Sequence, residues 1–538
     1  MKSHRMLPVL VLLASLRVES AHTADLRLSP VFSEHMVVQR DKPINVWGTA
    51  PAQAQVSVDF AGQRKTAIAD ADGRWLLTLD PRNASAEPHE LTVEAAGSRV
   101  KVSDVLIGEV WLLGGQSNME MPLWWRGDAD GMRNAEGTRL TLGTDHPWLR
   151  IMTVPQRSSR QPQEDFPQGE VDGDGVETGR WFVAAHRHPA ISGFSALGYF
   201  MAVQLHEKLG VPVGMIDTSF GGTVASAWNS RASLDSIPEA AEMLQKKDAA
   251  AAAWSEAGAR RQFEADLAAW EVAVAAAKAE KKNLPARPAM QTDPGQDRNF
   301  PAGVFNAMIW PLRHVTIRGV FFYQGENNCF DHEDPFAKTF PGVVLSWRQA
   351  FGTPELPFCI FQISGWGDAD ILYNAEKQPF IQETQHKAHL ALPATGFVVT
   401  TDYPHADIHP MVKRVIAERA LRWARAEVYG ERGVTWRTPA LESFQRDGAK
   451  MLLSFRTDGD EMLLAKGQPA PAGLVIAGSD GRFVEAKSQV KNRTSLLVWS
   501  DAVPEPVAVR YAWSSRGVCR LYSASGLPVG PFRTDDAD

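Results

Sequence analysis

Five nearly continuous apolar runs, separated by amphipathic stretches, constrain the fold of this chain more than any other feature. Uninterrupted apolar runs of this length are typical of strands buried on both faces, as in a parallel sheet covered by helices. Two of the intervening stretches, Ala196–Leu209 and Met411–Tyr429, have helical spacing. We therefore predict an α/β fold with an open parallel sheet and helices on both sides. The five runs are Val105–Leu113, Val211–Ile216, Gly319–Tyr323, Phe358–Ile363 and Thr395–Thr401.

Both flanks of this region have a different pattern, with short alternating strands between turn residues. Gln55–Phe60 and Glu90–Ala95 are examples before the α/β part, and Met451–Phe455 and Ser495–Trp499 are examples after it. Short strands at this spacing are typical of β-sandwiches. We predict an N-terminal β-sandwich domain over 25–103, a catalytic domain over 104–436 and a C-terminal β-domain over 437–538.

Residues 232–290 interrupt the alternation of strands and helices. Glu239–Glu280 is rich in Ala, Glu and Lys, with larger apolar residues at helical spacing, and Pro238 suits the first turn of a helix. We predict an inserted helical hairpin, and its simplest role is that of a solvated lid or brace.

The first 24 residues have the pattern of a secretory signal peptide. Lys2 and Arg5 precede the apolar stretch Met6–Leu16, and small and polar residues follow up to Ala24. This stretch is too short to span a bilayer, and no later run reaches the roughly 18 apolar residues that a membrane helix needs. We predict a signal peptide over 1–24 and an exported protein, periplasmic or extracellular.

The composition is that of a globular protein and excludes several classes of partner. Hydrophobic residues make up 44% and charged residues 22% of the 538 residues, and the formal net charge is −7. This balance argues against nucleic acid or an anionic membrane as partner, because both require a concentrated basic face. The chain has three cysteines, too few for a dense disulfide framework, and no CxxC metal motif.

The first candidate for chemistry lies where the first apolar run ends, at Gly114-Gly115-Gln116-Ser117. Two glycines allow a sharp turn, and a serine after them is exposed. If a helix follows, its positive end and free N–H groups would face the Ser117 oxygen and any oxyanion formed beside it. The alternative is that Ser117 is only a helix N-cap, which is common after glycines.

The second candidate is the segment Asp402–Pro410, which follows the last apolar run. A loop histidine such as His409 can act as a general base near neutral pH, and Asp407 or Asp402 could orient its ring. The serine motif G-x-S-x-G of α/β-hydrolases does not occur around Ser117. A rival interpretation is a metal site through His405, Asp407 and His409, with a further ligand from the segment 331–334.

Two more polar turns follow buried runs. Tyr323–Asn328 carries amides beside a glycine, and Asp217–Thr223 offers glycine N–H groups. Buried amides and backbone N–H groups at strand ends are good donors to an oxyanion. Since ligands bind at the carboxyl ends of parallel strands, we expect the four segments to meet at one site.

Together these segments resemble the sialate O-acetylesterase family of carbohydrate esterases, in the SGNH hydrolase superfamily. The resemblance covers nearly the whole chain after residue 24 except the insertion. It implies a flavodoxin-like SGNH hydrolase domain flanked by β-sandwich-like domains. The motifs that carry it are Gly-Gln-Ser-Asn-Met at 115–119, Phe-Gly-Gly-Thr at 220–223, Tyr-Gln-Gly-Glu-Asn-Asn at 323–328 and Asp-Ile-His-Pro at 407–410.

The resemblance implies roles for individual residues. Ser117 would be the nucleophile and His409 the general base. The backbone N–H groups of Ser117 and of Gly222 or its neighbour Gly221 would form the oxyanion hole with the amide of Asn327, and Gln324 competes with Asn327 for that role. The superfamily's usual acid lies three residues before the histidine, where this chain has Ala406, so Asp407, Asp402 or no carboxylate completes the triad.

The expected substrate is an O-acetylated sugar, in first place an O-acetylated sialic acid, and no metal or organic cofactor is expected. Acetylated xylan or pectin fragments are the competing substrates, and a non-catalytic carbohydrate-binding protein is the alternative from another class. Arg126 is the candidate cation for a sialic acid carboxylate, and the sequence leaves the oligomeric state open. The residues expected to contact substrate are Gln116, Asn118, Glu326 and Trp125, with Trp124, Trp310 and Trp366 as further aromatic candidates.

Overall fold

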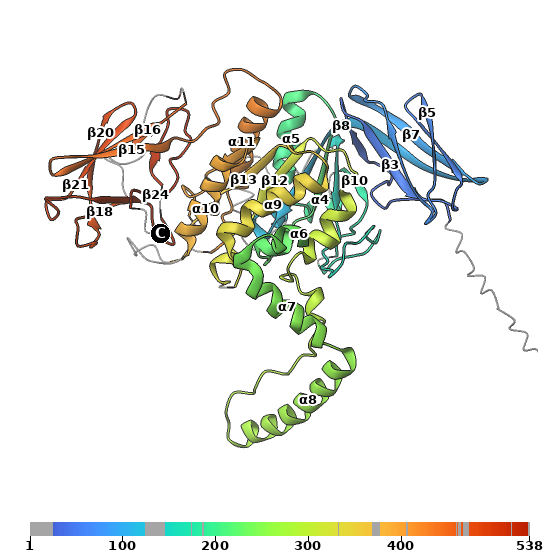
Figure 1. Cartoon of the computed structure of the whole chain (residues 1–538), viewed down its shortest axis with the longest axis horizontal. Helices are drawn as coiled ribbons and strands as arrows, with labels where there is room; N and C mark the ends of the chain where they lie inside the picture. The colour runs from blue at the N-terminus through green and yellow to red at the C-terminus, as the bar shows by residue number, and fades with distance from the viewer. Residues whose placement is uncertain are drawn as a thin grey trace, which may run out of the picture.

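The protein is elongated, with strands at both ends of a central α/β body (Figure 1). The predicted signal peptide lies outside the residues that this computed structural model describes, so its prediction stands on sequence alone. The described residues are 25–123, 146–173, 175–185, 188–331, 333–367, 377–404, 407–458, 460, 464–465, 473–517 and 519–535.

The central sheet contains all five predicted apolar runs as neighbouring strands. Its order is β10-β9-β11-β8-β12-β13-β14, and the pairs from β9 to β14 are parallel. The edge pair β10–β9 is antiparallel, so the sheet is mixed where the sequence predicted a parallel one. These strands are β8 (Ser98–Gly115), β9 (His146–Thr153), β10 (Trp181–Ala184), β11 (Val213–Asp217), β12 (Gly319–Tyr323), β13 (Phe358–Phe361) and β14 (Thr395–Val398).

Two pairs of helices cover this sheet, as predicted for an α/β fold. α5 (Ala196–Leu209) has the predicted bounds and packs against α11 (Lys413–Trp423). α9 (Phe336–Ala350) and α10 (Gln378–Ala391) pack together on the other side of the sheet (Figure 1). Within the described residues, no helix has both the length and the apolar character needed to cross a membrane.

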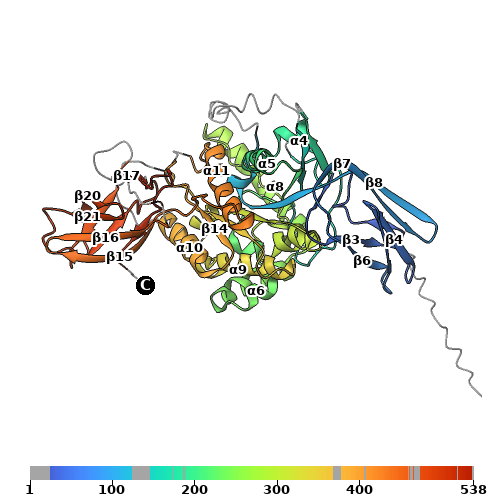
Figure 2. The same ribbon diagram turned by 90° about the horizontal axis from the view of Figure 1, so that it is seen from above.

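Strand β8 joins the N-terminal strands to the central sheet, and Figure 2 shows it running from one into the other. Its first part pairs antiparallel with β7 (Ser85–Ala95), and its last part lies between β11 and β12. The predicted domain boundary at 103/104 therefore falls inside one strand. The other N-terminal strands are β1 (Arg27–Leu28), β2 (Val37–Gln39), β3 (Ile44–Thr49), β4 (Gln55–Phe60), β5 (Gln63–Ile68) and β6 (Arg74–Leu79).

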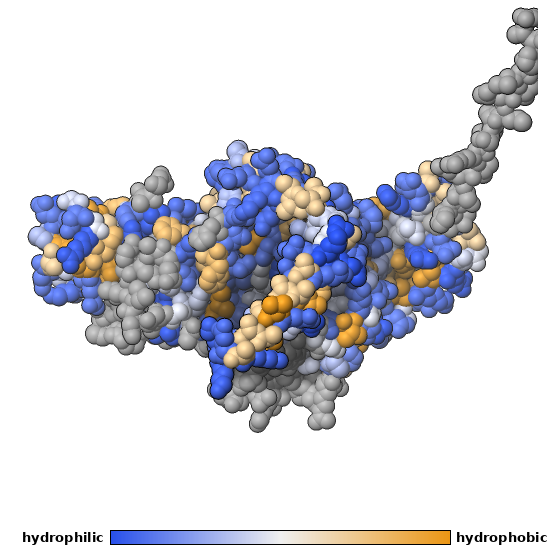
Figure 3. Space-filling view, turned by 90° about the horizontal axis from the view of Figure 1, so that it is seen from below, coloured by the Kyte–Doolittle hydropathy of each residue, from blue (hydrophilic) through white to orange (hydrophobic). Residues whose placement is uncertain are grey.

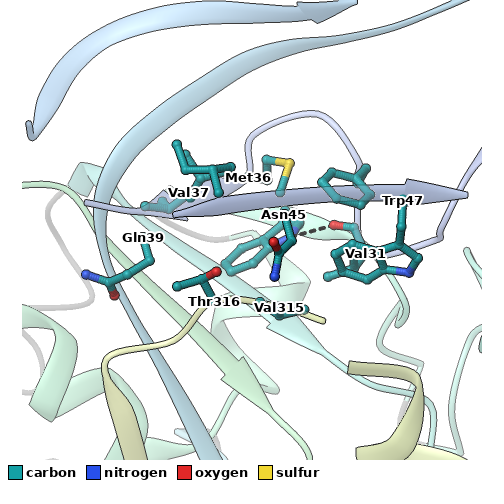
Figure 4. A pocket seen from close by; sticks show the side chains of 12 residues that line it. Val31, Met36, Val37, Gln39, Asn45, Trp47, Val315 and Thr316 are labelled. Atoms are coloured by element: carbon teal, nitrogen blue, oxygen red, sulfur yellow. Dashed lines mark hydrogen bonds between the residues drawn. The ribbon is translucent and has the colours of Figure 1, made fainter. Parts of the chain in front are cut away.

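A mostly apolar pocket marks the contact between the N-terminal strands and the central body (Figure 4). Val31, Met36 and Trp47 approach Val315, which lies shortly before β12. The indole of Trp181 donates a hydrogen bond of 3.0 Å to the Val31 carbonyl oxygen and so ties β10 to the same contact. The N-terminal strands and the central body thus share one apolar core.

A buried ion cluster around Glu109 reinforces this junction. The Glu109 side chain is fully buried and accepts hydrogen bonds from Arg40 at 2.5 Å and from Arg318 at 2.7 Å. Burial alone would raise the pKa of Glu109, but the hydrogen bonds and charges of Arg318 and Arg40 outweigh burial and lower it. One carboxylate in β8 therefore holds an arginine from the segment after β2 and another directly before β12.

The C-terminal strands form sheets with a separate core that includes Leu453, Ile476 and Tyr511. Arg533 joins them to the central body through two hydrogen bonds of 2.9 Å to Glu383 on α10. These strands are β15 (Ala440–Asp447), β16 (Lys450–Arg456), β17 (Leu464–Ala465), β18 (Leu474–Ala477), β19 (Val484–Glu485), β20 (Lys487–Asn492), β21 (Ser495–Trp499), β22 (Ala508–Tyr511), β23 (Leu521–Tyr522) and β24 (Phe532–Arg533).

The predicted helical insertion is an arm that projects from the central body (Figure 1). The arm contains α7 (Ala241–Ala253) and α8 (Glu256–Ala279), whereas α6 (Arg231–Asp235), just before them, packs against α9 in the body. The insertion is therefore not the predicted helical hairpin, because the chain returns beside α8 as an irregular segment over 282–293. The Trp270 indole donates a hydrogen bond of 2.9 Å to the Pro285 carbonyl oxygen and ties this segment to α8. Figure 3 views the molecule from the side on which the arm projects, and a band of apolar residues crosses this face.

We expect Glu109→Gln to lower the free energy of unfolding by about 3 kcal/mol, because it leaves two largely buried arginines without a carboxylate. Urea unfolding followed by tryptophan fluorescence would measure the loss. Glu94→Gln is the matched control, since Glu94 pairs with Arg64 and Arg99 at an exposed site and its loss should be much smaller. Equal losses in the two variants would contradict this account of the junction.

Candidate active site

The four polar segments meet at the carboxyl edge of the central sheet. β8 ends at Gly115, its neighbours β11 and β12 end at Asp217 and Tyr323, and the segment with His409 follows β14. Strands β9 and β11 lie on one side of β8 and strands β12 to β14 on the other, so this edge is a topological switch point, where open α/β sheets bind ligands.

Ser117 stands at the start of a short helix directly after β8. Gly115 has a φ of +115°, and a Cβ there would lie 2.0 Å from the Tyr323 carbonyl oxygen, so a larger residue would separate β8 from β12. Helix α1 (Ser117–Glu120) has Gln116 as its N-cap and Ser117 as its first residue. The alternative role of Ser117 as an N-cap is therefore wrong. At this position its backbone N–H points out of the helix end.

His409 contacts the Ser117 hydroxyl directly. Its Nε2 lies 2.9 Å from Ser117 Oγ, and its Nδ1 lies 3.3 Å from the carboxylate of Asp407. The histidine side chain is 18% exposed, whereas that of Asp407 is 59% exposed. The structure thus brings Ser117, His409 and Asp407 together in the order of a catalytic triad. The Asp407 carboxylate in this arrangement is exposed to solvent.

Asp402, the other carboxylate considered for the triad, lies in a different environment. Its two oxygens accept hydrogen bonds of 2.8 and 2.7 Å from the Arg419 guanidinium, and the Tyr522 hydroxyl lies 3.3 Å away. The side chain is almost completely buried. Asp402 therefore joins α11 to the C-terminal strands, and its charge is matched by Arg419.

The glycine and amide segments lie beside Ser117. A Cβ on Gly221 would lie 3.5 Å from the Ser117 Cβ, and Gly222 has a φ of +72°, which favours glycine. The Asn327 side chain donates a hydrogen bond of 2.8 Å to the Gly222 carbonyl oxygen. One N–H of this half-buried amide is thus engaged, and the amide has a second N–H to offer.

Gln324 and Gln116 face the interior. The Gln324 amide nitrogen donates to the Thr223 carbonyl oxygen at 2.7 Å and to Gln116 Oε1 at 3.0 Å. Gln116 Oε1 also accepts the backbone N–H of Asn327 at 3.1 Å. Both side chains are buried and bonded to protein. We therefore reassign them, from oxyanion donor and substrate ligand, to holding the second and third segments against the first.

Asn118 and Glu326, also expected to contact substrate, are fully buried beneath Ser117. Asn118 Nδ2 donates to Glu326 Oε1, and Lys413 Nζ donates to Asn118 Oδ1 at 2.7 Å. Burial raises the pKa of Glu326 to about 7 and lowers the pKa of Lys413 to about 7. We therefore reassign Asn118 and Glu326 from contacting substrate to supporting the site from the protein interior.

Lys413 did not emerge from the sequence analysis, although a signal for it exists. The buried residues of α11 include Ile416, Ala417, Ala420 and Leu421, and helical spacing places Lys413 on the same face. A lysine on a buried helix face needs a polar partner, and this indicates a buried polar cluster.

The described rim of the site carries a cation and aromatic rings. Arg298 is exposed, donates to the Gly221 carbonyl oxygen at 2.7 Å and lies 4.9 Å from the centre of the Phe220 ring. Phe330 is 61% exposed, and its ring lies 6.2 Å from that of Trp366. Trp310 instead packs against Arg313 and Phe305. The other expected rim residues, Trp124, Trp125 and Arg126, lie outside the described residues.

Two residues of the alternative metal site, His405 and His332, also lie outside the described residues. Among the residues that are described, no group of three or more His, Cys, Asp or Glu side chains is placed to hold a metal ion. Asp407 and His409 are described: Asp407 faces His409 Nδ1, and His409 Nε2 faces Ser117.

Comparison with known proteins identifies the class as carbohydrate esterase. The profile of a family described as carbohydrate esterase, sialic acid-specific acetylesterase, matches residues 302–414. A carbohydrate acetylesterase from Xanthomonas citri has a similar solved structure, with a TM-score of 0.75 and 32% identity over 95% of this chain and 99% of that one. The sialate O-acetylesterase of Rattus norvegicus is 26% identical over 99% of this chain and 98% of its own length, and that of Homo sapiens is 25% identical over 94% and 92%.

The chain belongs to the sialate O-acetylesterase family of carbohydrate esterases, as its motifs predicted, and it is a carboxylic ester hydrolase.

We expect Asp402→Asn to lower stability and Asp407→Asn to lower kcat. Asp402→Asn should cost about 3–5 kcal/mol of stability, because it leaves the buried Arg419 without its carboxylate. Asp407→Asn should lower kcat by about 10- to 100-fold, less than the roughly 10⁴-fold loss in a buried triad, because water screens the exposed carboxylate. Thermal unfolding and steady-state hydrolysis of 4-nitrophenyl acetate would measure the two effects. A large loss of kcat at unchanged stability in Asp402→Asn would assign the acid to Asp402.

Proposed function

We propose that the protein hydrolyses O-acetyl esters of sugars, in first place of sialic acid, with Ser117 as nucleophile and His409 as general base. The observation that carries this proposal is the 2.9 Å contact between His409 Nε2 and Ser117 Oγ, at the switch point of the sheet. The family to which the chain belongs supports the same reaction class.

The proposed reaction proceeds through an acyl-enzyme. His409 Nε2 takes the hydroxyl proton as Ser117 Oγ attacks the acetyl carbonyl carbon, and a tetrahedral intermediate forms. When this intermediate collapses, the bond to the sugar oxygen breaks and His409 returns the proton to the leaving alcohol. A water molecule activated by His409 then attacks the acetyl-serine, acetate leaves, and Ser117 regains its proton.

Three donors next to Ser117 form the proposed oxyanion hole. They are the backbone N–H of Ser117 at the start of α1, the backbone N–H of Gly222, and the second N–H of the Asn327 amide. Asn327 is preferred to Gln324 because both N–H groups of Gln324 have protein acceptors. The bond to the Gly222 carbonyl fixes the Asn327 amide, so the donor needs no reorganisation when charge develops.

Asp407 is the proposed orienting carboxylate. It lies 3.3 Å from His409 Nδ1, and it would favour the tautomer that leaves Nε2 free to accept the serine proton. The charge of Asp402 is already matched by Arg419. We therefore prefer Asp407, although it lies two residues before His409 and not three as is usual in the superfamily.

The rim favours an acidic sugar over a neutral one. Arg298 lies beside the proposed oxyanion glycines, and within the described residues no carboxylate pairs with it. A guanidinium in this place suits the carboxylate of a sialic acid. The exposed ring of Phe330 provides a surface on which the apolar face of a sugar can pack. Acetylated xylan and pectin fragments remain the competitors, because the ester chemistry is the same.

The chain context of the site is also a proposal. We infer an SGNH-type hydrolase domain over 104–436, flanked by a β-domain over 25–103 and another over 437–538. The basic and apolar pattern of residues 1–24 supports export to the periplasm or the medium, where acetylated glycans would be met.

The wild-type protein should release acetate from O-acetylated sialic acid, and Ser117→Ala should abolish this release, because the acyl-enzyme cannot form. Acetate release would be compared on O-acetylated sialic acid and on acetylated xylan oligosaccharides. Ser236→Ala, at an exposed serine in the insertion, is the control and should keep full activity. Activity that persists in Ser117→Ala would refute the mechanism, and activity on xylan fragments alone would refute the substrate.

Arg298→Gln in the same assay should raise KM for the sialic acid about 10-fold, the effect of losing a charged hydrogen bond.

Asn327→Ala should lower kcat by about 10²- to 10³-fold, because it removes one oxyanion donor. KM should change little, since this donor acts on the transition state rather than on bound substrate. Steady-state kinetics on the preferred sugar acetate would separate the two constants. A variant that loses only stability, with kcat intact, would exclude Asn327 from the oxyanion hole.

A further inference from the structure

The Asn118 side chain connects three segments beneath the Ser117–His409 pair. Its amide nitrogen donates to the Ile408 carbonyl oxygen at 3.1 Å and to Glu326 Oε1 at 2.5 Å. Its amide oxygen accepts a hydrogen bond of 2.7 Å from Lys413 Nζ. Asn118, Glu326 and Lys413 are all fully buried, so water does not compete for these contacts.

The hydrogen bond from Asn118 to Ile408 matters because of where these two residues lie in the sequence. Asn118 directly follows Ser117, and Ile408 directly precedes His409. The hydrogen bond from Asn118 to Ile408 therefore joins the backbone next to the serine to the backbone next to the histidine. The Ser117–His409 contact of 2.9 Å is made just outside this bridge.

The partners of Asn118 select one orientation of its amide. The Lys413 ammonium can only donate a hydrogen bond, so it requires the amide oxygen. An ionised Glu326 can only accept one, so it requires the amide nitrogen. Lys413 Nζ also donates to the Asn118 backbone oxygen at 3.0 Å, which keeps the lysine in place. In this orientation the second N–H of the amide points at Ile408, whereas a flipped amide would place two oxygens against one another there.

We propose that Asn118 is a positioning residue that holds His409 against Ser117, and that Lys413 and Glu326 hold the Asn118 amide in the orientation this requires. The inference rests on the proposed roles of Ser117 and His409. A buried lysine and a buried glutamate are costly to maintain, and this function explains why they lie under the site rather than a pair of apolar side chains.

Asn118→Asp is the variant that tests the bridge. It keeps the size of the side chain, removes the N–H donors and places an oxygen against the Ile408 carbonyl. We expect kcat to fall about 100-fold, the scale of a misplacement near 1 Å, with KM almost unchanged. The rate at which a fluorophosphonate labels Ser117 should fall by a similar factor, because labelling needs the same base but no sugar contact.

Asn229→Asp is the matched control. Asn229 is also fully buried, and its amide nitrogen also donates to two backbone carbonyls, those of Ala225 and Thr339. This variant should lose stability and keep kcat and the labelling rate. Lys413→Met is the second test variant, because a methionine suits the apolar face of α11 while removing the donor to Asn118. It should lower kcat and labelling without raising KM.

The outcomes separate this inference from the proposed function. Equal kcat in Asn118→Asp and Asn229→Asp, or a change in KM alone, would overturn the positioning role. If Asn118→Asp does not fold, Lys413→Met decides, and unchanged kcat and labelling in that variant would overturn the inference. An inactive Ser117→Ala beside a fully active Asn118→Asp would refute only the positioning role. An active Ser117→Ala would refute the proposed mechanism itself.

Discussion

The arrangement of the site depends on the hydrogen bonds that the side-chain oxygen of Gln116 accepts. It accepts hydrogen bonds from the Gln324 amide and from the Asn327 backbone, while the Gln116 backbone N–H donates to the Tyr323 carbonyl oxygen at 2.9 Å. The end of β8 and the end of β12 are thus held together directly before Ser117. Gly115 permits this approach, because any Cβ there would meet the Tyr323 carbonyl oxygen. Through Gln324 and Thr223 the same contact extends to the glycines after β11.

Beneath these strand ends lies a polar layer that an apolar sheet would not contain without a function. Asp217 ends β11 fully buried, and burial raises its pKa to about 7 in spite of its hydrogen bonds to Ser219. Glu326 and Lys413, which both contact Asn118, are also fully buried, and burial moves the pKa of each to about 7 because it disfavours the charged form. Groups of this kind reduce stability and cluster at active sites, where they fix the geometry of other groups.

Two buried carboxylates are used instead to join the parts of the chain. Glu109 binds Arg40 and Arg318 where the N-terminal strands meet the central sheet, and Asp402 binds Arg419 where α11 meets the C-terminal strands. Glu109 holds two arginines at once, and the charge of Asp402 is already matched by Arg419. This is the physical reason why the nearest aspartate in the sequence, Asp407, faces His409, although it is exposed and lies at an unusual spacing.

The sequence by itself determined the α/β fold, the five central strands, the helix Ala196–Leu209, the strands at both ends and the four polar segments, because apolar periodicity and turn residues are local signals. It did not predict β9 and β10, since β9 begins with exposed residues and their pairing is not local. It also placed Gln116, Asn118 and Glu326 against substrate, because residue type alone does not show which way a side chain points. Tertiary structure decided that these three face inward, that Lys413 joins them, and which aspartate meets His409. Burial and the choice of hydrogen-bond partner arise only when segments far apart in the sequence pack together.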